Sequence, residues 1–314
     1  MKRVIIVGCG GQDGRLLFEK LQSAGNHVLG INRDSIQCTE PYLASSIDVA
    51  NQQEVLESIR QWYPDEIYYL AAYHHSSQDL VSIAPLELFH QSFTIHVKGL
   101  LNFLEAIRVI KPTTRLFYAA SSLVFGDAST PVQNESTPFN PKCVYGITKT
   151  SGIHCCQLYR KTHGIFASSG ILYNHESIYR QEKFVSQKIM QTAIKIANGE
   201  ATHLDLGDLS VQVDWGYAPD YVDAMEQIIM LDNSDEFIIA TGESHTVKEM
   251  VEIVFEHLDL DWKKFVRVDP SLIMRERPLL VGDASKLHDL TGWRPSVSFS
   301  SMIKSILGEQ CRAT

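Results

Sequence analysis

The first half of the chain alternates short apolar, β-branched segments with amphipathic helical patterns, and this alternation limits the possible folds more than any other feature. Strands alternating with helices are typical of βαβ units, whose parallel strands are joined by helices on both faces of one sheet. The sequence therefore predicts an α/β fold with a Rossmann-like doubly wound parallel sheet. The expected strands are Arg3–Val7, Asn26–Ile31, Glu66–Ala71, Arg115–Ala120 and Ala167–Leu172. The expected helices run from the first glycine turn to about Ala24, over Gln53–Trp62, through a long segment ending near Ile110, and over Val144–His163.

A glycine-rich turn joins the first expected strand to the first expected helix. Its glycines are spaced as Gly8-x-x-Gly11-x-x-Gly14, with Gln12 and Asp13 between the last two. Glycine permits a tight turn and a close approach of the backbone to a pyrophosphate, which the helix N-terminus then faces with free N–H groups. Because the turn lies at the first strand–helix junction, we expect it to bind a dinucleotide.

The end of the second expected strand bears on the choice of cofactor. NAD enzymes usually place a carboxylate there, on the adenosine 2′-hydroxyl. This chain instead has Asn32 followed by Arg33, which favours a 2′-phosphate, although Asp34 weakens the local positive field. The sequence favours NADP and leaves NAD open.

A tyrosine and a lysine are spaced to share one helix face. Tyr145 and Lys149 are one turn apart in an expected helix, and Ser121 and Ser122 come at the end of the preceding strand. A nearby ammonium stabilises a phenolate, so we expect Lys149 to lower the pKa of Tyr145 and prepare it for acid–base work on a hydroxyl. Active sites of such sheets form at the carboxyl ends of the strands. Ser121, Tyr145 and Lys149 are thus the predicted catalytic residues, for hydride transfer at a carbinol.

After about Asn174 the alternation breaks. The segments Phe184–Asn198, Thr202–Leu206 and Arg267–Leu280 do not continue it, whereas Tyr217–Leu231 and Phe237–His257 look like a return to the main domain. We therefore predict two interleaved parts. Residues 1–173, with parts of 210–260, form the NADP-binding domain, and residues 174–209 and 261–314 form a smaller C-terminal substrate lobe.

Composition excludes several classes of function. The formal net charge of −9 argues against nucleic-acid binding, and no apolar run approaches the ~18 residues of a membrane span. The opening MKRVIIVGCGG does not have the pattern of a signal peptide, so a cytoplasmic location is expected. The cysteines form no Cys-x-x-Cys pair, so we expect reduced thiols and no metal site. They are Cys9, Cys38, Cys143, Cys155, Cys156 and Cys311.

Blocks along nearly the whole chain resemble the GDP-mannose 4,6-dehydratases, within the extended short-chain dehydrogenases. The Asn-His-Glu-Ser and Asp-Trp-Gly blocks are the most specific to that branch. The matching blocks are Gly11–Gly14, Pro64–Tyr68, Leu70–Ala72, Thr137–Phe139, Tyr145 with Lys149, Asn174–Ser177, Asp214–Gly216, Asp220–Val222, Ala240–Gly242 and Gly282–Lys286.

The resemblance implies a GDP-linked nucleotide-sugar substrate and a homodimer or higher homo-oligomer, the dimer using the long helices after the third and fourth strands. It implies NADP contacts from Gly8, Gly11, Gln12, Asp13, Gly14, Arg33, Asp48, Leu70, Ala71, Ala72, Tyr145, Lys149, His175 and Arg180. It implies substrate contacts from Ser122, Leu123, Asn174 and Lys188, with Arg277 near the diphosphate. Cations suit a diphosphate because they make charge-assisted hydrogen bonds.

The chain departs from this family at the expected substrate site. The family's Thr-Ser-Glu reads Ser121-Ser122-Leu123 here, so the glutamate that helps remove water across C5 and C6 is replaced by Leu123. An acid–base group typically contributes 10²–10⁴-fold, and leucine transfers no proton. Glu135 is a poor substitute because its own context belongs to the family pattern. Val213 stands in place of an arginine, and Ala72-Tyr73-His74-His75 in place of Ala-Gln-Ser-His.

Three functions follow from these observations. The favoured one is hydride transfer at sugar C4 without net dehydration, as 4-keto reduction, 4-epimerisation or 4-oxidation. The second is a working 4,6-dehydratase with a relocated acid–base group, for which His74 and His75 are the first candidates because histidine titrates near neutral pH. The third is a non-catalytic NADP-binding protein, against which the intact Ser121, Tyr145 and Lys149 argue.

Overall fold

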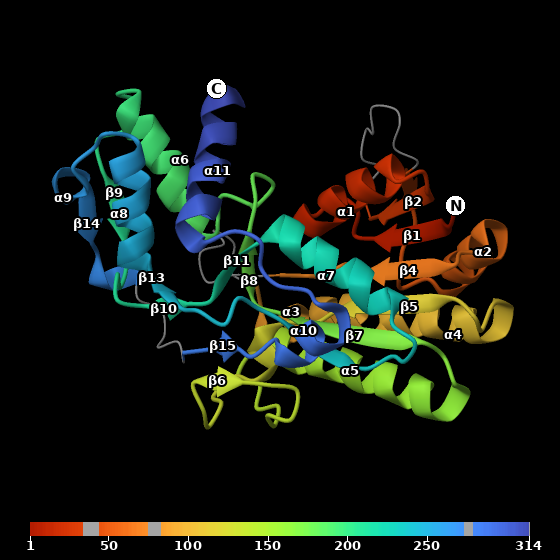
Figure 1. Ribbon diagram of the computed structural model, residues 1–314. Helices are drawn as coiled ribbons and strands as arrows, with labels where there is room; N and C mark the ends of the chain where they lie inside the picture. The colour runs from red at the N-terminus through yellow and green to blue at the C-terminus, as the bar shows by residue number, and fades with distance from the viewer. Residues whose placement is uncertain (34–43, 75–82, 273–278, 314) are drawn as a thin grey trace.

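A parallel sheet of seven strands forms the centre of the molecule, in a computed structural model that describes residues 1–33, 44–74, 83–272 and 279–313 (Figure 1). All six neighbouring strand pairs are parallel, which confirms the predicted Rossmann-like fold. In spatial order the strands are β12 (Glu236–Ile239), β7 (Ala167–Leu172), β5 (Arg115–Ala119), β4 (Glu66–Tyr69), β1 (Arg3–Val7), β2 (His27–Asn32) and β3 (Ala44–Ser46).

Helices cover both faces of this sheet. In β1, Val4 and Ile6 pack into one core while Ile5 and Val7 pack into the other, because successive side chains of a strand point to opposite faces. The first core is closed by α1 (Gln12–Ser23), α7 (Ala218–Met230) and α10 (Ser285–Thr291). The second is closed by α2 (Gln52–Trp62), α4 (Leu100–Ile110) and α5 (Val144–His163).

The long helical segment predicted to end near Ile110 is not one regular helix. It consists of α3 (Pro85–Phe93), the π-helical turn η1 (Thr94–Gly99) and α4. A π turn changes the hydrogen bonding of the helix backbone, and two tyrosine hydroxyls donate to carbonyls in this turn: Tyr69 to Ile95 O (2.6 Å) and Tyr118 to His96 O (3.4 Å). A Cβ at Gly99 would lie 2.3 Å from the Tyr69 hydroxyl, so glycine is needed for this approach.

A smaller lobe has its own apolar core, formed by α6 (Val185–Ala197), α8 (Val247–His257) and α11 (Phe299–Ala313). Beside them lie the parallel pair β9 (Leu204–Leu206) and β14 (Val266–Val268), with α9 (Trp262–Phe265) and η3 (Pro270–Leu272). This lobe and the sheet domain lie side by side in Figure 1. The domain limits given from the sequence remain a prediction. The packing adds that α8 contributes to the core of the smaller lobe and α10 to that of the sheet domain.

Short strand pairs link the two parts where the chain crosses between them. They are β8 (Asn174–Glu176) with β11 (Trp215–Tyr217), β10 (Gln212–Val213) with β13 (His245–Thr246), and β6 (Val132–Gln133) with β15 (Val281–Gly282). The buried carboxylate of Asp214 accepts hydrogen bonds from the backbone N–H groups of Thr241 (3.0 Å), Gly242 (3.2 Å) and Gly282 (3.1 Å). One side chain therefore holds two crossing segments together.

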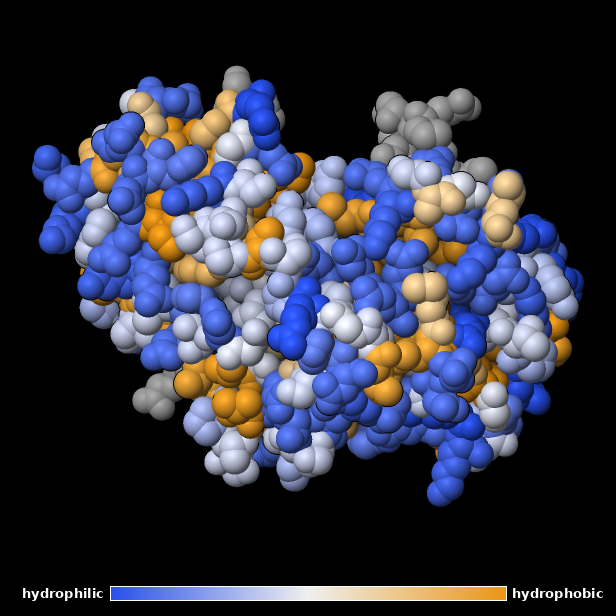
Figure 2. Space-filling view, viewed as in Figure 1, coloured by the Kyte–Doolittle hydropathy of each residue, from blue (hydrophilic) through white to orange (hydrophobic). Residues whose placement is uncertain are grey.

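On the face drawn in Figure 2, apolar residues form small separate patches among polar ones. Within the described ranges, no helix is both long and apolar enough to cross a membrane. The cytoplasmic location expected from the sequence remains a prediction.

Candidate active site

The glycine turn is built so that its backbone lies against the end of β4. Gly8 has φ +89°, and a Cβ on it would come within 2.8 Å of the Ala71 backbone nitrogen. A Cβ on Gly14 would lie 2.3 Å from Gly8 O, so α1 and β1 approach each other closely only with glycine there. Gly11 is the N-cap of α1 and contributes no side chain. The first N–H groups of α1 are therefore oriented for a phosphate, as a dinucleotide requires.

The other predicted cofactor residues of the sheet domain lie at the same carboxyl edge. Asn32 ends β2 and the exposed Arg33 follows it, while Leu70, Ala71 and Ala72 follow β4. Asp48 is exposed, and its carboxylate accepts from Ala50 N at 2.9 Å. Asp34 lies outside the described residues.

Tyr145 and Lys149 share one face at the start of α5, as predicted. Cys143 caps this helix, its sulfur accepting from Gly146 N at 3.4 Å. Lys149 is buried, and its ammonium donates to Ala119 O, the last carbonyl of β5, at 2.7 Å. The same nitrogen lies 5.7 Å from the centroid of the half-buried Tyr145 ring and 5.0 Å from that of Tyr118. The helix thus presents phenol and amine together above the end of β5.

The expected effect of Lys149 on the pKa of Tyr145 is not found in the free protein. Burial raises the pKa of the phenol above its ordinary value, and the cation that opposes this effect is the guanidinium of Arg180. Burial also lowers the pKa of Lys149 to about 7, so a large part of it carries no charge at neutral pH. The prediction required a charged ammonium beside the phenol, whereas burial disfavours the charged form of both groups.

Leu123 lies beside the first turn of α5, and Ser121 is the N-cap of the short helix that carries Leu123. The Ser121 hydroxyl accepts from Leu123 N at 3.3 Å and caps the short 3₁₀ helix η2 (Ser122–Val124). A Cβ on Gly146 would lie 2.4 Å from Leu123 O, so glycine permits η2 to lie directly beside the turn that carries Tyr145. Ser121 and Leu123 are half-buried, and Ser122 is buried. The structure thus brings the predicted Ser121, Tyr145 and Lys149 to one edge of the sheet.

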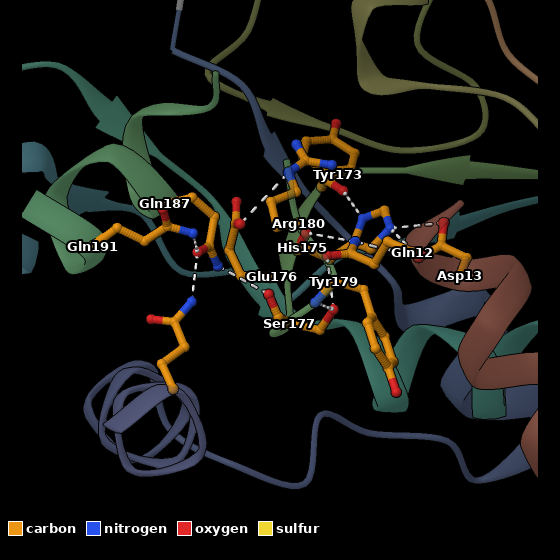
Figure 3. A network of polar contacts seen from close by, with 11 residues as sticks. Gln12, Asp13, Tyr173, His175, Glu176, Ser177, Tyr179, Arg180, Gln187 and Gln191 are labelled. Atoms are coloured by element: carbon orange, nitrogen blue, oxygen red, sulfur yellow. Dashed lines mark hydrogen bonds and ion pairs between the residues drawn. The ribbon is translucent and has the colours of Figure 1, made fainter. Parts of the chain in front are cut away.

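A polar network links the glycine turn to the Asn-His-Glu-Ser segment (Figure 3). The Nε2 of His175 lies 2.9 Å and 3.0 Å from the two carboxylate oxygens of Asp13, while Nδ1 lies 2.7 Å from Tyr173 O. Gln12 donates to His175 O at 3.0 Å and accepts from the Ser177 hydroxyl at 3.0 Å. The two blocks, far apart in sequence, therefore form one structural unit.

His175 and Asp13 are held as an ion pair. Burial alone would lower the pKa of His175, but the Asp13 carboxylate outweighs burial and the net pKa is raised. Burial acts to raise the pKa of Asp13, but the charges of His175 and then Arg180 outweigh it, and the net pKa is lowered. Both ring nitrogens of His175 face acceptors, which suits the imidazolium form.

Arg180 belongs to this network, and its charge also acts on Tyr145. Its Nε is 3.5 Å from a carboxylate oxygen of Glu176, and its guanidinium carbon is 3.6 Å from the centroid of the Phe184 ring. Burial raises the pKa of Glu176, and Arg180 opposes that shift. Arg180 thus influences the predicted catalytic phenol as well as the residues around the glycine turn.

The predicted substrate residues outside η2 are dispersed. Asn174 is exposed at the start of β8, and Lys188 donates to Asp205 O at 2.7 Å. Arg277 lies outside the described residues. Glu135 accepts from Ile238 N at 2.9 Å, a structural bond at the edge strand.

Two histidines that the catalytic prediction did not include lie against Tyr145. The ring of His74 is 5.3 Å from that of Tyr145 and the ring of His96 is 5.0 Å from it, both edge to face. His74 also lies 5.2 Å from Phe184, and Lys183 donates to its carbonyl at 3.1 Å. The sequence singled out His74 as a possible acid–base group. His96 has no such signal in the sequence, because a lone histidine in an apolar helical pattern does not differ from a packing residue. His75 lies outside the described residues.

Comparison with known proteins agrees with this arrangement. The doubly wound sheet with a Tyr145–Lys149 helix beside a glycine turn defines the class of extended short-chain dehydrogenases. A profile of the GDP-mannose 4,6 dehydratase family matches residues 5–306. The chain belongs to this family, whose members are nucleotide-sugar-modifying enzymes. GDP-mannose 4,6 dehydratase 2 of Arabidopsis thaliana is 36% identical over 329 residues, which cover 98% of this chain and 86% of that protein.

Solved structures share the fold at lower identity. The UDP-glucose 4-epimerase of Thermus thermophilus, solved with NAD, has a TM-score of 0.84 and 21% identity, covering 99% of this chain and 100% of that one. RMD from Pseudomonas aeruginosa, solved with NADPH, has a TM-score of 0.80 and 19% identity, covering 100% of both chains.

Proposed function

We propose that this protein is an NADP-dependent enzyme that transfers hydride at C4 of a GDP-linked sugar without net loss of water. The observation that carries the proposal is the grouping of Ser121, Tyr145 and Lys149 at one edge of the sheet, with Leu123 in the place where the family resemblance puts a glutamate. The proton-transfer groups for redox chemistry at a carbinol are present. The group for elimination is replaced by an apolar side chain.

The chain has a suitable cradle for a nicotinamide dinucleotide. Gly8 and Gly14 permit the close backbone approach of the glycine turn, so that the N-terminus of α1 would face a pyrophosphate. Arg33 follows β2, where a 2′-phosphate would be held. When bound, the cofactor supplies the hydride acceptor or donor. NADP is preferred in this proposal, and the affinities for NADP⁺ and NAD⁺ measured side by side would test that preference.

Three side chains of the protein would carry out the other steps of the reaction. Tyr145 exchanges a proton with the C4 oxygen, the Ser121 hydroxyl hydrogen-bonds that oxygen, and Lys149 orients the cofactor ribose. Because burial raises the pKa of Tyr145, the phenol of the free protein is protonated at neutral pH. A protonated phenol donates to a carbonyl, so 4-keto reduction is the first direction to test.

The experiment is to incubate the purified chain with NADPH and GDP-4-keto-6-deoxymannose, and in parallel with NADP⁺ and GDP-mannose. Cofactor absorbance and product mass are followed. We expect oxidation or reduction of the cofactor without a product lighter by one water. Loss of water from GDP-mannose at the rate of a family dehydratase would contradict the proposal. The variant L123E supplies a carboxylate at that place and is the matched test of whether its absence prevents elimination.

A 4,6-dehydratase with a relocated acid–base group is the second candidate. It is favoured by one observation, the edge-to-face contact of the His74 and Tyr145 rings at 5.3 Å. If water loss is found, H74Q should reduce it at least tenfold while leaving cofactor binding intact. Unchanged water loss in H74Q would remove His74 from this role.

We also propose that the protein forms a homodimer through α3 and α5, which pack against each other. Their exposed apolar residues are Leu86, Phe89 and Phe93 on α3, and Ile147 and Leu158 on α5. The Phe89 and Phe93 rings stack at 6.3 Å. Sedimentation analysis of the wild type and of L158K would test the association.

A further inference from the structure

His96 occupies an unusual place for an ionisable side chain. It lies in the π turn η1 with none of its surface exposed, and its ring contacts that of Tyr145 edge to face at 5.0 Å. π turns inside α-helices are rare and frequently occur at functional sites. The hydroxyls of Tyr69 and Tyr118 hold this turn through its carbonyls, so the backbone that carries His96 is fixed.

Both ring nitrogens of His96 have partners, and the partners determine the tautomer. The Nε2 atom accepts from the backbone N–H of Tyr73 at 2.9 Å and therefore carries no proton. The neutral ring must then carry its proton on Nδ1, which lies 2.7 Å from the hydroxyl oxygen of Thr148. His96 thus donates to Thr148 and accepts from Tyr73.

Thr148 connects His96 to the turn of α5 that carries Tyr145. Its hydroxyl lies 2.9 Å from Val144 O and 3.1 Å from Tyr145 O, so its proton bonds a carbonyl of the first turn of α5 while its oxygen accepts from His96. Tyr73, on the other side, is next to His74, whose ring lies 5.3 Å from that of Tyr145. The imidazole therefore joins the segment after β4 to the start of α5.

We propose that His96 is a positioning residue, which fixes Tyr145 through Thr148 and the Tyr73–His74 segment through its backbone bond. The inference rests on the proposed function, because it assigns His96 to the same reaction centre. A neutral ring is required: a proton on Nε2 would face the N–H of Tyr73. Burial, followed by the charges of Lys149 and His74, lowers the pKa of His96 well below its ordinary value. The imidazole of His96 is therefore neutral at physiological pH.

The first test needs no substrate and uses the full chain. In long-range ¹H–¹⁵N spectra we expect one histidine in the Nδ1–H tautomer, assigned to His96 by its loss in H96N. The ¹³Cζ signal of Tyr145, assigned with Y145F, should shift in H96N and T148V, return toward the wild-type position in T148S, and stay in place in H154N. His154 is exposed on α5 and is the matched control. An Nε2–H or charged His96, or a Tyr145 signal that is the same in all variants, would overturn the proposal.

The second test separates positioning from folding. H96N keeps a donor near the Nδ1 position, and H96Q keeps an acceptor near Nε2, so each removes one of the two bonds. If the wild type reduces GDP-4-keto-6-deoxymannose, H96N, H96Q and T148V should lower kcat about 10- to 100-fold with the Kd for NADPH changed less than about twofold, since small misplacements of reacting groups have such effects. A folded T148V with wild-type kcat would contradict the proposal.

The two proposals fail differently. If the wild type turns over neither GDP-linked sugar, the proposed function is wrong, while the tautomer of His96 and the shift of the Tyr145 signal still decide the positioning role. T148V replaces a hydroxyl by a methyl of similar size, so it remains informative if H96N does not fold.

Discussion

His96 and His175 are both buried, both use their two ring nitrogens in hydrogen bonds, and both lie near the carboxyl edge of the sheet, yet their pKa values are shifted in opposite directions. His96 faces a backbone N–H and a hydroxyl, with Lys149 close by, and it is neutral. His175 faces the Asp13 carboxylate and a carbonyl, and its charged form is stabilised. Burial acts to lower the pKa of both histidines, but at His175 the Asp13 carboxylate outweighs it. The difference shows that the partners of a buried histidine determine its charge.

The two histidines also belong to clusters with different tasks. The His96 cluster, with Thr148, Tyr145 and Lys149, lies within the sheet domain, and we propose that it serves turnover. The His175 cluster joins the glycine turn to the strand pair at the start of the smaller lobe, and we propose that it serves cofactor binding and stability.

Replacement of Tyr145 gives the largest expected effect. Y145F removes the only hydroxyl proposed to exchange a proton with C4, so kcat should fall about 10²–10⁴-fold while NADPH binding is retained. Y159F is the matched control on the same helix, where Tyr159 donates to Glu105 at 3.2 Å. Initial rates and a fluorescence titration of NADPH check the prediction. Similar losses in both variants would show that the damage is structural.

Replacement of His175 should give a smaller, pH-dependent effect. The raised pKa of His175 means that its stabilisation is full below about pH 6.5 and is lost as pH rises through the higher folded pKa. Asp13 has a lowered pKa and stays ionised throughout this range. H175Q should therefore cost about 1–3 kcal/mol of unfolding free energy at pH 5.5 and less at pH 8.5. Urea unfolding at both pH values measures this, with H154Q as the exposed control. An equal cost at the two pH values would refute the ion pair.

Lys149 should affect stability with a pH dependence opposite to that of His175. Its folded pKa of about 7 lies below the ordinary value of 10.5, so between these pH values the unfolded chain binds more protons and the wild type gains stability as pH rises. K149M should lack this gain, which is about 3 kcal/mol between pH 7 and 9.5 for the folded pKa of about 7. Lys98 is exposed, so the control variant K98M should retain the gain in stability as pH rises. Thermal unfolding of the three proteins at the two pH values provides the measurement, and parallel curves for wild type and K149M would contradict the buried amine.

Much of the fold was predictable because the sheet is parallel and buried on both faces. The strands Arg3–Val7 and Ala167–Leu172 and the helix Val144–His163 have the predicted bounds, since their apolar runs end at glycines or polar turns. The π turn at Thr94–Gly99 was missed, because Tyr69 and Tyr118, distant in sequence, supply the donors that accommodate it.

The candidate site was predictable where a motif has local geometry. The spacing of Gly8, Gly11 and Gly14 and the one-turn spacing of Tyr145 and Lys149 follow from the chain itself. The electrostatics did not follow, because the pKa of Tyr145 depends on burial and on Arg180, which comes 35 positions later in the sequence. The role of His96 was also hidden, since its partners Tyr73 and Thr148 come from two other elements.

The carboxylate of Asp214 has a mechanical consequence. It binds Thr241, Gly242 and Gly282 at the places where the chain passes from one part of the molecule to the other. A movement of the smaller lobe that preserves these three hydrogen bonds would be a rotation about Asp214, with larger displacements at α9 and β14, which lie at the far end of that lobe (Figure 1).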